Sequence, residues 1–416
     1  MFEKTVLRNG VRILHEHVPS VRSAALGIWV GVGSRYETAE ENGSSHFIEH
    51  MLFKGTEHRT AAELARETDA IGGRINAYTT RECTCFYGHV LDSHLPALTD
   101  ILCDMFFHSL FREEDVESER GVIFEEIDMY ADDPEDLVHE QLYLNAFAGS
   151  SLARPVLGTR KSLKHVNADR LRGFRSRCYT GRNVVVALAG SYTDHDLGSL
   201  TDAFSYLPAG TPLTARRASY HPRFILREKE SEQNQLVLAY PSISLNDPSR
   251  YAFSLLSAIL GGTASSRLFQ TVREQRGLCY GISSGGFCHR KEGIYAIHTG
   301  LNPETEREAL TLILDELDRL KQDGVTDGEL TAAKDLTRSN LLMGLESTVS
   351  RMNTLGRGEL FSGKVTSPEE DCERYDAVTG EEILQLARRW LDNSLLSFSA
   401  VGRPAPEPFY REVLGR

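Results

Sequence analysis

The sequence repeats its own hydrophobic pattern at an offset of about half its length. Val166 aligns with Val378, an offset of 378 − 166 = 212, and Gly190 then aligns with Gly402 without a gap. Between these points, both copies read as an amphipathic helix followed by a buried strand. The same offset places the strand-like run 24–28 on residues 236–240. Two such coincidences at one offset predict duplicated halves of about 200 residues each, a normal domain size.

The length and the local composition place the boundary between the halves. The chain has 416 residues, more than one ordinary domain needs. Residues 208–217 are rich in Pro, Gly and Thr, as in an exposed linker. We therefore predict an N-terminal catalytic domain at 1–212, a linker at 213–224 and a homologous C-terminal domain at 225–416.

The pattern within each half predicts an α+β fold. Asn9-Gly10 lies between two apolar runs, which favours a hairpin. Strand-like runs of this kind alternate with helical patterns, for example at residues 95–107 and 308–320. We expect each half to be a mostly antiparallel sheet packed against helices.

Composition excludes some classes of function. The formal net charge is −13, with 59 acidic and 46 basic residues, so a sequence-independent nucleic-acid binder is not expected. The seven cysteines are scattered and odd in number, which is typical of reduced thiols in the cytoplasm. The sequence contains neither a secretory signal nor a run of 18 apolar residues, so we expect no membrane partner.

A short string in the first half points to metal chemistry. Residues 45–53 contain neither Pro nor Gly and read as a helix. His46 and His50 are four apart, so both imidazoles can face one ion, and zinc favours such ligands. Glu49 can then reach a water at the ion without being a ligand, as in the inverted zinc-peptidase motif. The alternative is a helix with two incidental histidines.

A third ligand has to come from a distant segment. Read as a helix, residues 117–130 carry Glu119 and Glu126 on an apolar stripe formed by Val122, Ile123, Ile127 and Tyr130. Buried carboxylates require a cation. We therefore predict Glu126 as the ligand and Glu119 as a carboxylate that orients the site. The alternative is a different helical phase that leaves both glutamates in solvent.

These residues resemble a known family. The motif His46-Phe47-Ile48-Glu49-His50, followed by Glu126 at 126 − 50 = 76, is similar to that of the pitrilysin/insulinase family of zinc peptidases. Residues 51–56 and 72–79 also match family strings. The resemblance covers nearly the whole chain. It is greatest to the branch that contains the mitochondrial processing peptidase β subunit and its bacterial relatives.

The resemblance extends into the second half. Residues 261–269 and 273–280 resemble the family's C-terminal segment, where an Arg and a Tyr reach the substrate. These are Arg273 and Tyr280 here; without the resemblance they read as a solvated arginine and a core tyrosine. The positions 212 residues after His46, Glu49 and His50 cannot bind a metal, since they are Ala258, Gly261 and Gly262. The second half is therefore expected to be a scaffold without its own zinc.

The resemblance implies a function and its parts. It implies one Zn²⁺ per chain, Glu49 as the base, and a clamshell whose halves enclose the substrate. The enzyme would be a zinc-dependent endopeptidase that hydrolyses peptides or processes precursor segments held as an added strand, and it would form a homodimer. The residues implied to contact the substrate are Phe53, Asn76, Ala77, Tyr78, Arg273 and Tyr280. The alternative within the family is a non-catalytic or partner subunit of a related peptidase complex, and a zinc hydrolase of another fold is the alternative outside it.

Overall fold

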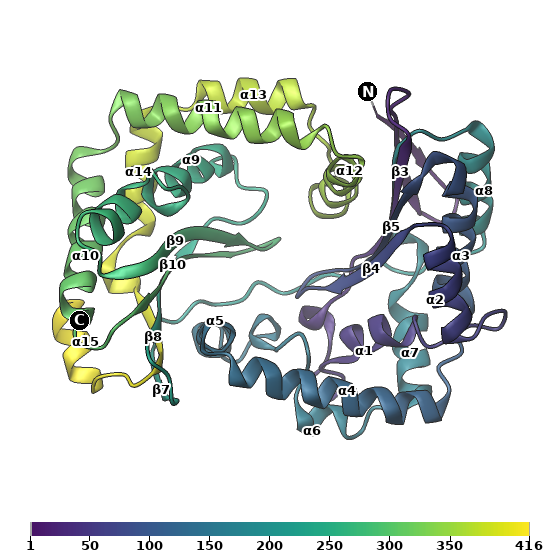
Figure 1. The fold of residues 1–416 in the computed structure, drawn as a ribbon, viewed down its shortest axis with the longest axis horizontal. Helices are drawn as coiled ribbons and strands as arrows, with labels where there is room; N and C mark the ends of the chain where they lie inside the picture. Colours follow the sequence, from purple (N-terminus) through teal and green to yellow (C-terminus); the bar gives the residue numbers. More distant parts are fainter. Residues whose placement is uncertain (1, 416) are drawn as a thin grey trace. The chain divides into compact units, whose positions relative to one another are not determined.

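The first half of the sequence builds a six-stranded sheet (Figure 1). The computed structural model describes residues 2–415. In spatial order the strands are β1 (Glu3–Val6), β2 (Arg12–His17), β6 (Val184–Gly190), β3 (Ser23–Val30), β5 (Thr84–Leu91) and β4 (Arg74–Thr79). β2 and β6 are parallel, and the other neighbouring pairs are antiparallel. At the predicted hairpin, Gly10 has a φ of 91° and its amide donates to the Leu7 carbonyl at 2.9 Å.

The second half builds a five-stranded sheet with a matching order. Its strands are β7 (Phe224–Glu228), β11 (Ser397–Gly402), β8 (Asn234–Ser242), β10 (Gly293–Leu301) and β9 (Cys279–Cys288). β7 and β11 are parallel, and the other pairs are antiparallel. An offset of 212 places β2, β3 and β6 on β7, β8 and β11. The predicted α+β class and the two homologous half-domains are therefore confirmed.

Helices cover one face of each sheet and form the two main cores. On the first sheet these are α1 (Ser44–Met51), α2 (Ala61–Ala70), α3 (Leu95–His108), α4 (Glu113–Asp132), α6 (Arg160–Leu163), α7 (Ala168–Cys178) and α8 (Asp194–Ser205). On the second they are α9 (Arg250–Gly261), α10 (Glu306–Asp323), α11 (Asp327–Gly344), α13 (Pro368–Ala377), α14 (Gly380–Trp390) and α15 (Glu407–Val413). α7 and α14 are the helix of the repeat, and their bounds differ by 212 at both ends.

The opposite face of each sheet is covered by a helix from the other half of the sequence. α12 (Thr348–Ser362) packs Met352 and Leu355 against Trp29 of the first sheet. α5 (Pro134–Ala146) packs Val138 against Val237 of the second sheet. This helix buries the second apolar face of each sheet, which would otherwise be exposed to water.

The two compact units are consequently discontinuous in sequence. Unit 1 comprises residues 2–127, Arg154–Arg216 and Leu342–Ser367, and unit 2 comprises Asp128–Ala153, Arg217–Leu341 and residues 368–415. The predicted domains, 1–212 and 225–416, describe the sequence repeat, whereas the packed units exchange α5 and α12. The predicted clamshell arrangement stays a prediction.

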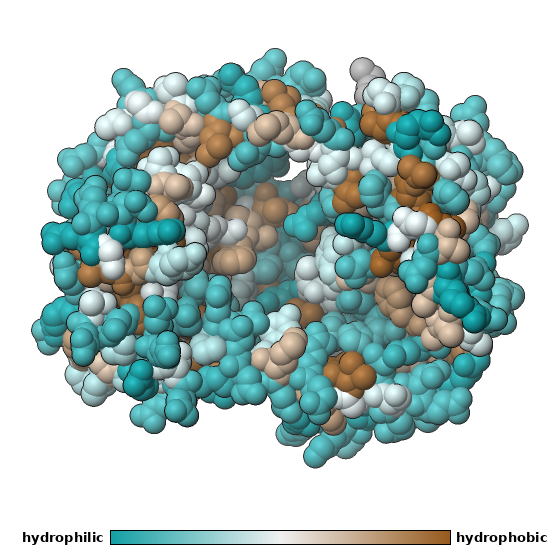
Figure 2. Space-filling view, in the orientation of Figure 1, coloured by the Kyte–Doolittle hydropathy of each residue, from teal (hydrophilic) through white to brown (hydrophobic). Residues whose placement is uncertain are grey.

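Polar side chains dominate the face of the molecule in Figure 2, and apolar residues form small scattered groups there. Within residues 2–415, none of the helices combines the length and the apolar composition that crossing a membrane requires. No disulfide bond joins the seven cysteines, all of which lie within the described residues.

The contact between α12 and the first sheet gives a test of the exchange. A Cβ atom added to Gly356 would lie 2.4 Å from the fully buried ring of Trp29. Gly356→Ala should therefore destabilise the protein by about 1–3 kcal/mol, because the ring has no space to retreat. Gly198→Ala on α8 is the control: it has open space around it and should be neutral or stabilise by up to about 1 kcal/mol. Urea denaturation followed by circular dichroism measures both, and equal effects would contradict the packing of α12.

Candidate metal centre

Two imidazoles lie side by side on α1. His46 is buried and His50 is half-buried, and their Nε2 atoms are 3.2 Å apart. The ring centroids are 4.5 Å apart. The predicted helix over residues 45–53 is thus present as Ser44–Met51, and its one-turn spacing brings both nitrogens to the same place.

A carboxylate from α4 completes the cluster. Oε2 of Glu126 lies 3.6 Å from Nε2 of His46 and 3.6 Å from Nε2 of His50. Ligand atoms about 2 Å from a tetrahedral zinc ion are about 3.3 Å apart, so the three atoms are spaced for one ion. The two nitrogens and one oxygen are also a ligand set that zinc accepts, and they leave a fourth position for water or substrate.

The buried face of α4 differs in part from the apolar stripe predicted from the sequence. Ile123 is buried as predicted, but Val122 and Tyr130 are 48% and 42% exposed. The buried face of α4 is therefore narrower than the predicted stripe. Glu119 is nevertheless buried and Glu126 half-buried, because both turn toward the histidines of α1.

Glu119 holds His50 in one orientation. Its Oε1 accepts a hydrogen bond from Nδ1 of His50 at 2.9 Å, and its Oε2 pairs with the ammonium group of Lys54. Burial opposes ionisation of Glu119, but the hydrogen bonds from His50 and Lys54 lower its pKa overall. A carboxylate at Nδ1 fixes the tautomer that leaves the Nε2 lone pair directed at the cluster. Burial and the neighbouring His50 lower the pKa of His46 to about 3, so His46 is neutral at pH 7.

Glu49 faces the same space from α1 without joining the cluster. Its Oε2 accepts a hydrogen bond of 2.5 Å from the Thr79 hydroxyl at the end of β4. Burial raises the pKa of the Glu49 carboxyl, and the hydrogen bond from Thr79 opposes that shift in part. A half-buried carboxylate with a raised pKa is a stronger base than an ordinary glutamate and is therefore better suited to accept a proton.

A buried carboxylate outside the cluster supports the start of α1. Glu37 is 2% exposed, and its carboxylate accepts hydrogen bonds from the amides of Gly43 and Ser45 at 2.7 Å each and from the Asn42 side chain at 3.0 Å. Burial raises the pKa of Glu37, whereas these hydrogen bonds lower it. The first amides of a helix have no partner within the helix. Glu37 therefore replaces a local N-cap side chain, which α1 lacks because Gly43 occupies that position.

The residues expected to contact substrate lie on or beside an edge strand. Asn76, Ala77 and Tyr78 are in β4, which is the last strand of the first sheet, and Phe53 is half-buried just after α1. Successive side chains of a strand point to opposite faces. Accordingly, Thr79 faces Glu49, while the Tyr78 hydroxyl accepts a hydrogen bond from Trp29 at 3.2 Å on the other face.

Arg273 and Tyr280 come together within unit 2. Arg273 lies in a π-helix, Phe269–Glu274, and its guanidinium is 5.1 Å from the centroid of the Tyr280 ring in β9. Tyr280 is 84% exposed, so it is not the core tyrosine that the alternative reading gives. The two side chains form one cationic and aromatic surface.

The positions in α9 that correspond to the cluster carry no ligands. Ala258 and Gly261 lie in α9 and Gly262 follows it. The other group of three potential ligands within residues 2–415 lies elsewhere, at Glu57, His58 and His108.

Sequence reasoning did not find three residues that contact the cluster or its helix. Lys54 and Thr79 lie in the strings that resemble the family, but their side-chain contacts join segments far apart in sequence. Glu37 precedes α1 by seven residues in an irregular segment, where no periodic pattern identifies a buried carboxylate.

Comparison with known structures shows the same fold. A peptidase M16 inactive domain from Pseudomonas fluorescens superposes with a TM-score of 0.89 over 97% of this chain and 98% of that chain, at 21% identity. A protease from Helicobacter pylori gives 0.90 over 97% and 99%, at 19% identity.

Sequence comparison is more specific. The insulinase profile (Peptidase family M16) matches residues 12–160, and the M16 inactive-domain profile matches residues 165–337. The "uncharacterized zinc protease YmxG" of Bacillus subtilis is 40% identical over 94% of this chain and 95% of its own length. A Streptomyces coelicolor protein, also called an uncharacterized zinc protease, is 40% identical over 92% and 86%. The resemblance noted in the sequence is thereby confirmed, and this chain belongs to the insulinase family of peptidases, M16, in a group with bacterial zinc proteases.

Proposed function

We propose that the protein is a zinc-dependent endopeptidase that binds one Zn²⁺ per chain through His46, His50 and Glu126. The observation that carries the proposal is the spacing of their three ligand atoms, 3.2 to 3.6 Å, beside a carboxylate that is not itself a ligand. Zinc bound there supplies Lewis-acid chemistry, which lowers the pKa of a bound water toward about 7 and polarises a carbonyl.

Glu49 acts as the general base and then as the general acid. It accepts the proton of a water molecule as that water attacks the scissile carbonyl, and it delivers the proton to the leaving amine. The hydrogen bond from Thr79 fixes the carboxylate on the side of α1 that faces β4. Glu119 keeps His50 oriented, and Lys54 keeps Glu119 ionised.

The substrate is proposed to bind as an added strand along β4. An edge strand offers unpaired amides and carbonyls to an extended peptide. Asn76, Ala77 and Tyr78 would make backbone contacts, with Phe53 nearby. Arg273 and Tyr280 would contact the substrate from unit 2, with Tyr280 as a donor to the developing oxyanion.

The substrates would be peptides or precursor segments held in an enclosed cavity. We further propose a cytoplasmic homodimer whose partner is the peptide substrate, with neither nucleic acid nor membrane as a ligand. The competing function is a non-catalytic or partner subunit of a related peptidase complex. The presence of Glu49 together with all three candidate ligands favours the enzyme.

Glu49→Gln separates catalysis from metal binding. The variant should keep the zinc held by His46, His50 and Glu126 and lose about 10²- to 10⁴-fold in peptidase activity, because the proton acceptor is gone. His50→Ala should lose this zinc as well as the activity. Elemental analysis and a mixed peptide library read by mass spectrometry measure both. Wild-type protein that holds zinc but cleaves no peptide would support the non-catalytic alternative, and active Glu49→Gln would remove Glu49 as the base.

Glu37→Gln tests the support of α1 at a distance from the cluster. An amide NH₂ in place of one carboxylate oxygen would face at least one donor, so at least one hydrogen bond would be lost at a cost of about 1–3 kcal/mol. We expect a lower unfolding midpoint and faster loss of zinc to a chelator. Glu40→Gln is the matched control, since Glu40 is exposed. Unchanged zinc release in Glu37→Gln would show that α1 does not depend on this carboxylate.

Arg273→Ala tests the contribution of unit 2. Loss of one charged hydrogen bond to the substrate should lower kcat/KM about 10- to 100-fold while zinc content stays unchanged. Arg276→Ala, three residues away and ion-paired with Glu308 at 3.3 Å, should retain wild-type kinetics. Equal kinetics for both variants would dismiss Arg273 as a substrate contact.

A further inference from the structure

We propose that Glu57, His58 and His108 form a second binding site for a zinc-class divalent cation, separate from the cluster on α1. One ligand atom of each residue lies within 4.8 Å of the others. Nδ1 of His108 is 3.9 Å from Oε2 of Glu57, and the two imidazole centroids are 5.1 Å apart. Two imidazoles and one carboxylate form the same ligand set as His46, His50 and Glu126.

The backbone holds the three ligands in place. The amide of Glu57 donates to the carbonyl of His108 at 3.0 Å, and Thr56 forms an isolated β-bridge with Ser109. The Thr56 hydroxyl accepts from the amide of His58 at 3.1 Å. The segment that carries Glu57 and His58 is therefore fastened to the end of α3 that carries His108. Since all three side chains are exposed, small rotations would bring their atoms from 4.8 Å to the spacing of about 3.3 Å that one ion requires.

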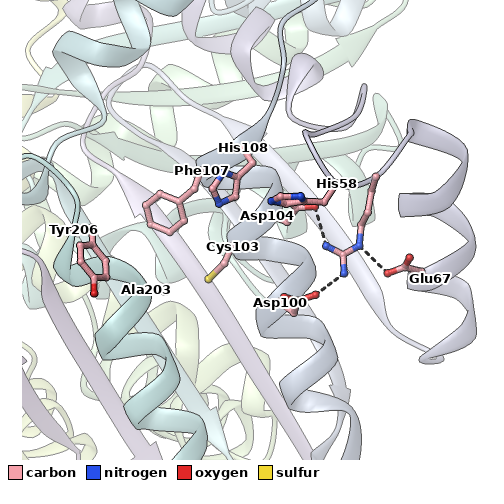
Figure 3. A pocket seen from close by; sticks show the side chains of 10 residues that line it. His58, Glu67, Asp100, Cys103, Asp104, Phe107, His108, Ala203 and Tyr206 are labelled. Atoms are coloured by element: carbon pink, nitrogen blue, oxygen red, sulfur yellow. Dashed lines mark hydrogen bonds and ion pairs between the residues drawn. The ribbon is translucent and has the colours of Figure 1, made fainter.

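The charges around the site favour a cation. Arg59 pairs at once with Glu67, Asp100 and Asp104, as the dashed lines in Figure 3 show. The three carboxylates carry three negative charges and the guanidinium carries one positive charge, which leaves a net charge of −2. Glu57 adds a further negative charge beside His108. A divalent cation at His58 and His108 would offset this excess.

An open cavity adjoins the two histidines. It has a volume of about 750 Å³, and His58, Cys103, Phe107 and His108 are among the residues that line it (Figure 3). The ion would thus keep one side accessible to water or to a small ligand. Three protein ligands with a fourth position open to water are the arrangement of catalytic zinc sites, in contrast to closed structural ones.

The second site is connected to the support of α1. The hydroxyl of Ser109 donates to the carbonyl of Met51, the last residue of α1, at 3.1 Å. An ion that joins Glu57 to His108 would strengthen the contact between the segment that carries Glu57 and the end of α3. We therefore infer that zinc beyond the first equivalent stabilises unit 1, because it binds the folded form.

The experiment is a titration of metal-free full-length protein with Zn²⁺, read by isothermal calorimetry and by elemental analysis after desalting. Wild-type protein should bind two equivalents. His58→Ala/His108→Ala should bind one, and His50→Ala should bind one at the remaining site. The variant that combines all three substitutions should bind none. The single variant His108→Ala should bind the second ion at least about 10- to 100-fold more weakly than wild type.

Two further measurements guard against trivial explanations. His195→Ala, an exposed histidine of α8 outside both clusters, should retain two equivalents. Thermal unfolding of metal-free protein should give the same midpoint for the double variant and wild type, and only wild type should gain stability from the second equivalent. A single equivalent in wild type, or two in the double variant, would overturn the second site. In the other outcome, wild-type protein binds a single equivalent that persists in the double variant and disappears in His50→Ala. That result would refute the second site and would leave the proposed peptidase centre intact.

Discussion

Unit 1 contains several buried or half-buried carboxylates near α1, and removing their negative charge from water is energetically costly. Glu49 belongs to α1, and Glu119 and Glu126 of α4 contact the two imidazoles of α1. Burial raises the pKa of both Glu49 and Glu126, and the charge of Glu126 adds to the shift of Glu49. Carboxylates are kept in such surroundings only when a cation or several hydrogen bonds compensate them. Lys54 and His50 compensate Glu119. A divalent cation would compensate the other two carboxylates, and the protein fold around α1 presents its ligands with the required spacing.

That spacing depends on contacts at both ends of a short helix. An isolated helix of eight residues is not stable in water. Glu37 binds the amides at its start, and Ser109 binds the carbonyl of Met51 at its end. Thr79 at the end of β4 then fixes Glu49 relative to the sheet. The first sheet thus supplies the edge at which a peptide could be added, and the same edge strand positions the proposed base.

The features that depend on a regular spacing of residues along the chain could be predicted from the sequence. The His46 and His50 spacing, the repeat at 212 and the strands that this repeat relates depend on periodic patterns, and the structure has them where they were expected. The face of α4 was predicted less well, since Val122 and Tyr130 are exposed. The apolar residues along one side of a helix do not show how much of that side a neighbouring element will cover. The same limit applies to α5 and α12, because an amphipathic helix indicates that it covers a sheet without indicating which sheet. Glu37 and Thr79 act through contacts that leave no periodic trace.

The repeat also explains why one half can bind a metal and the other cannot. A Cβ atom at Gly261 would lie 2.6 Å from the hydroxyl oxygen of Ser284 in β9 and 2.8 Å from its amide nitrogen. A Cβ atom at Gly262 would lie 2.9 Å from Cα of Ala258. The end of α9 therefore packs so closely that glutamate or histidine cannot be accommodated there. In α1 the corresponding positions hold Glu49 and His50 at half-buried sites beside β4 and α4. The candidate ligands of the first half lie between α1 and α4, whereas in the second half the end of α9 packs directly on β9 at Gly261. Restoring ligands by substitution in α9 would first require its separation from β9, which would cost the packing that stabilises unit 2.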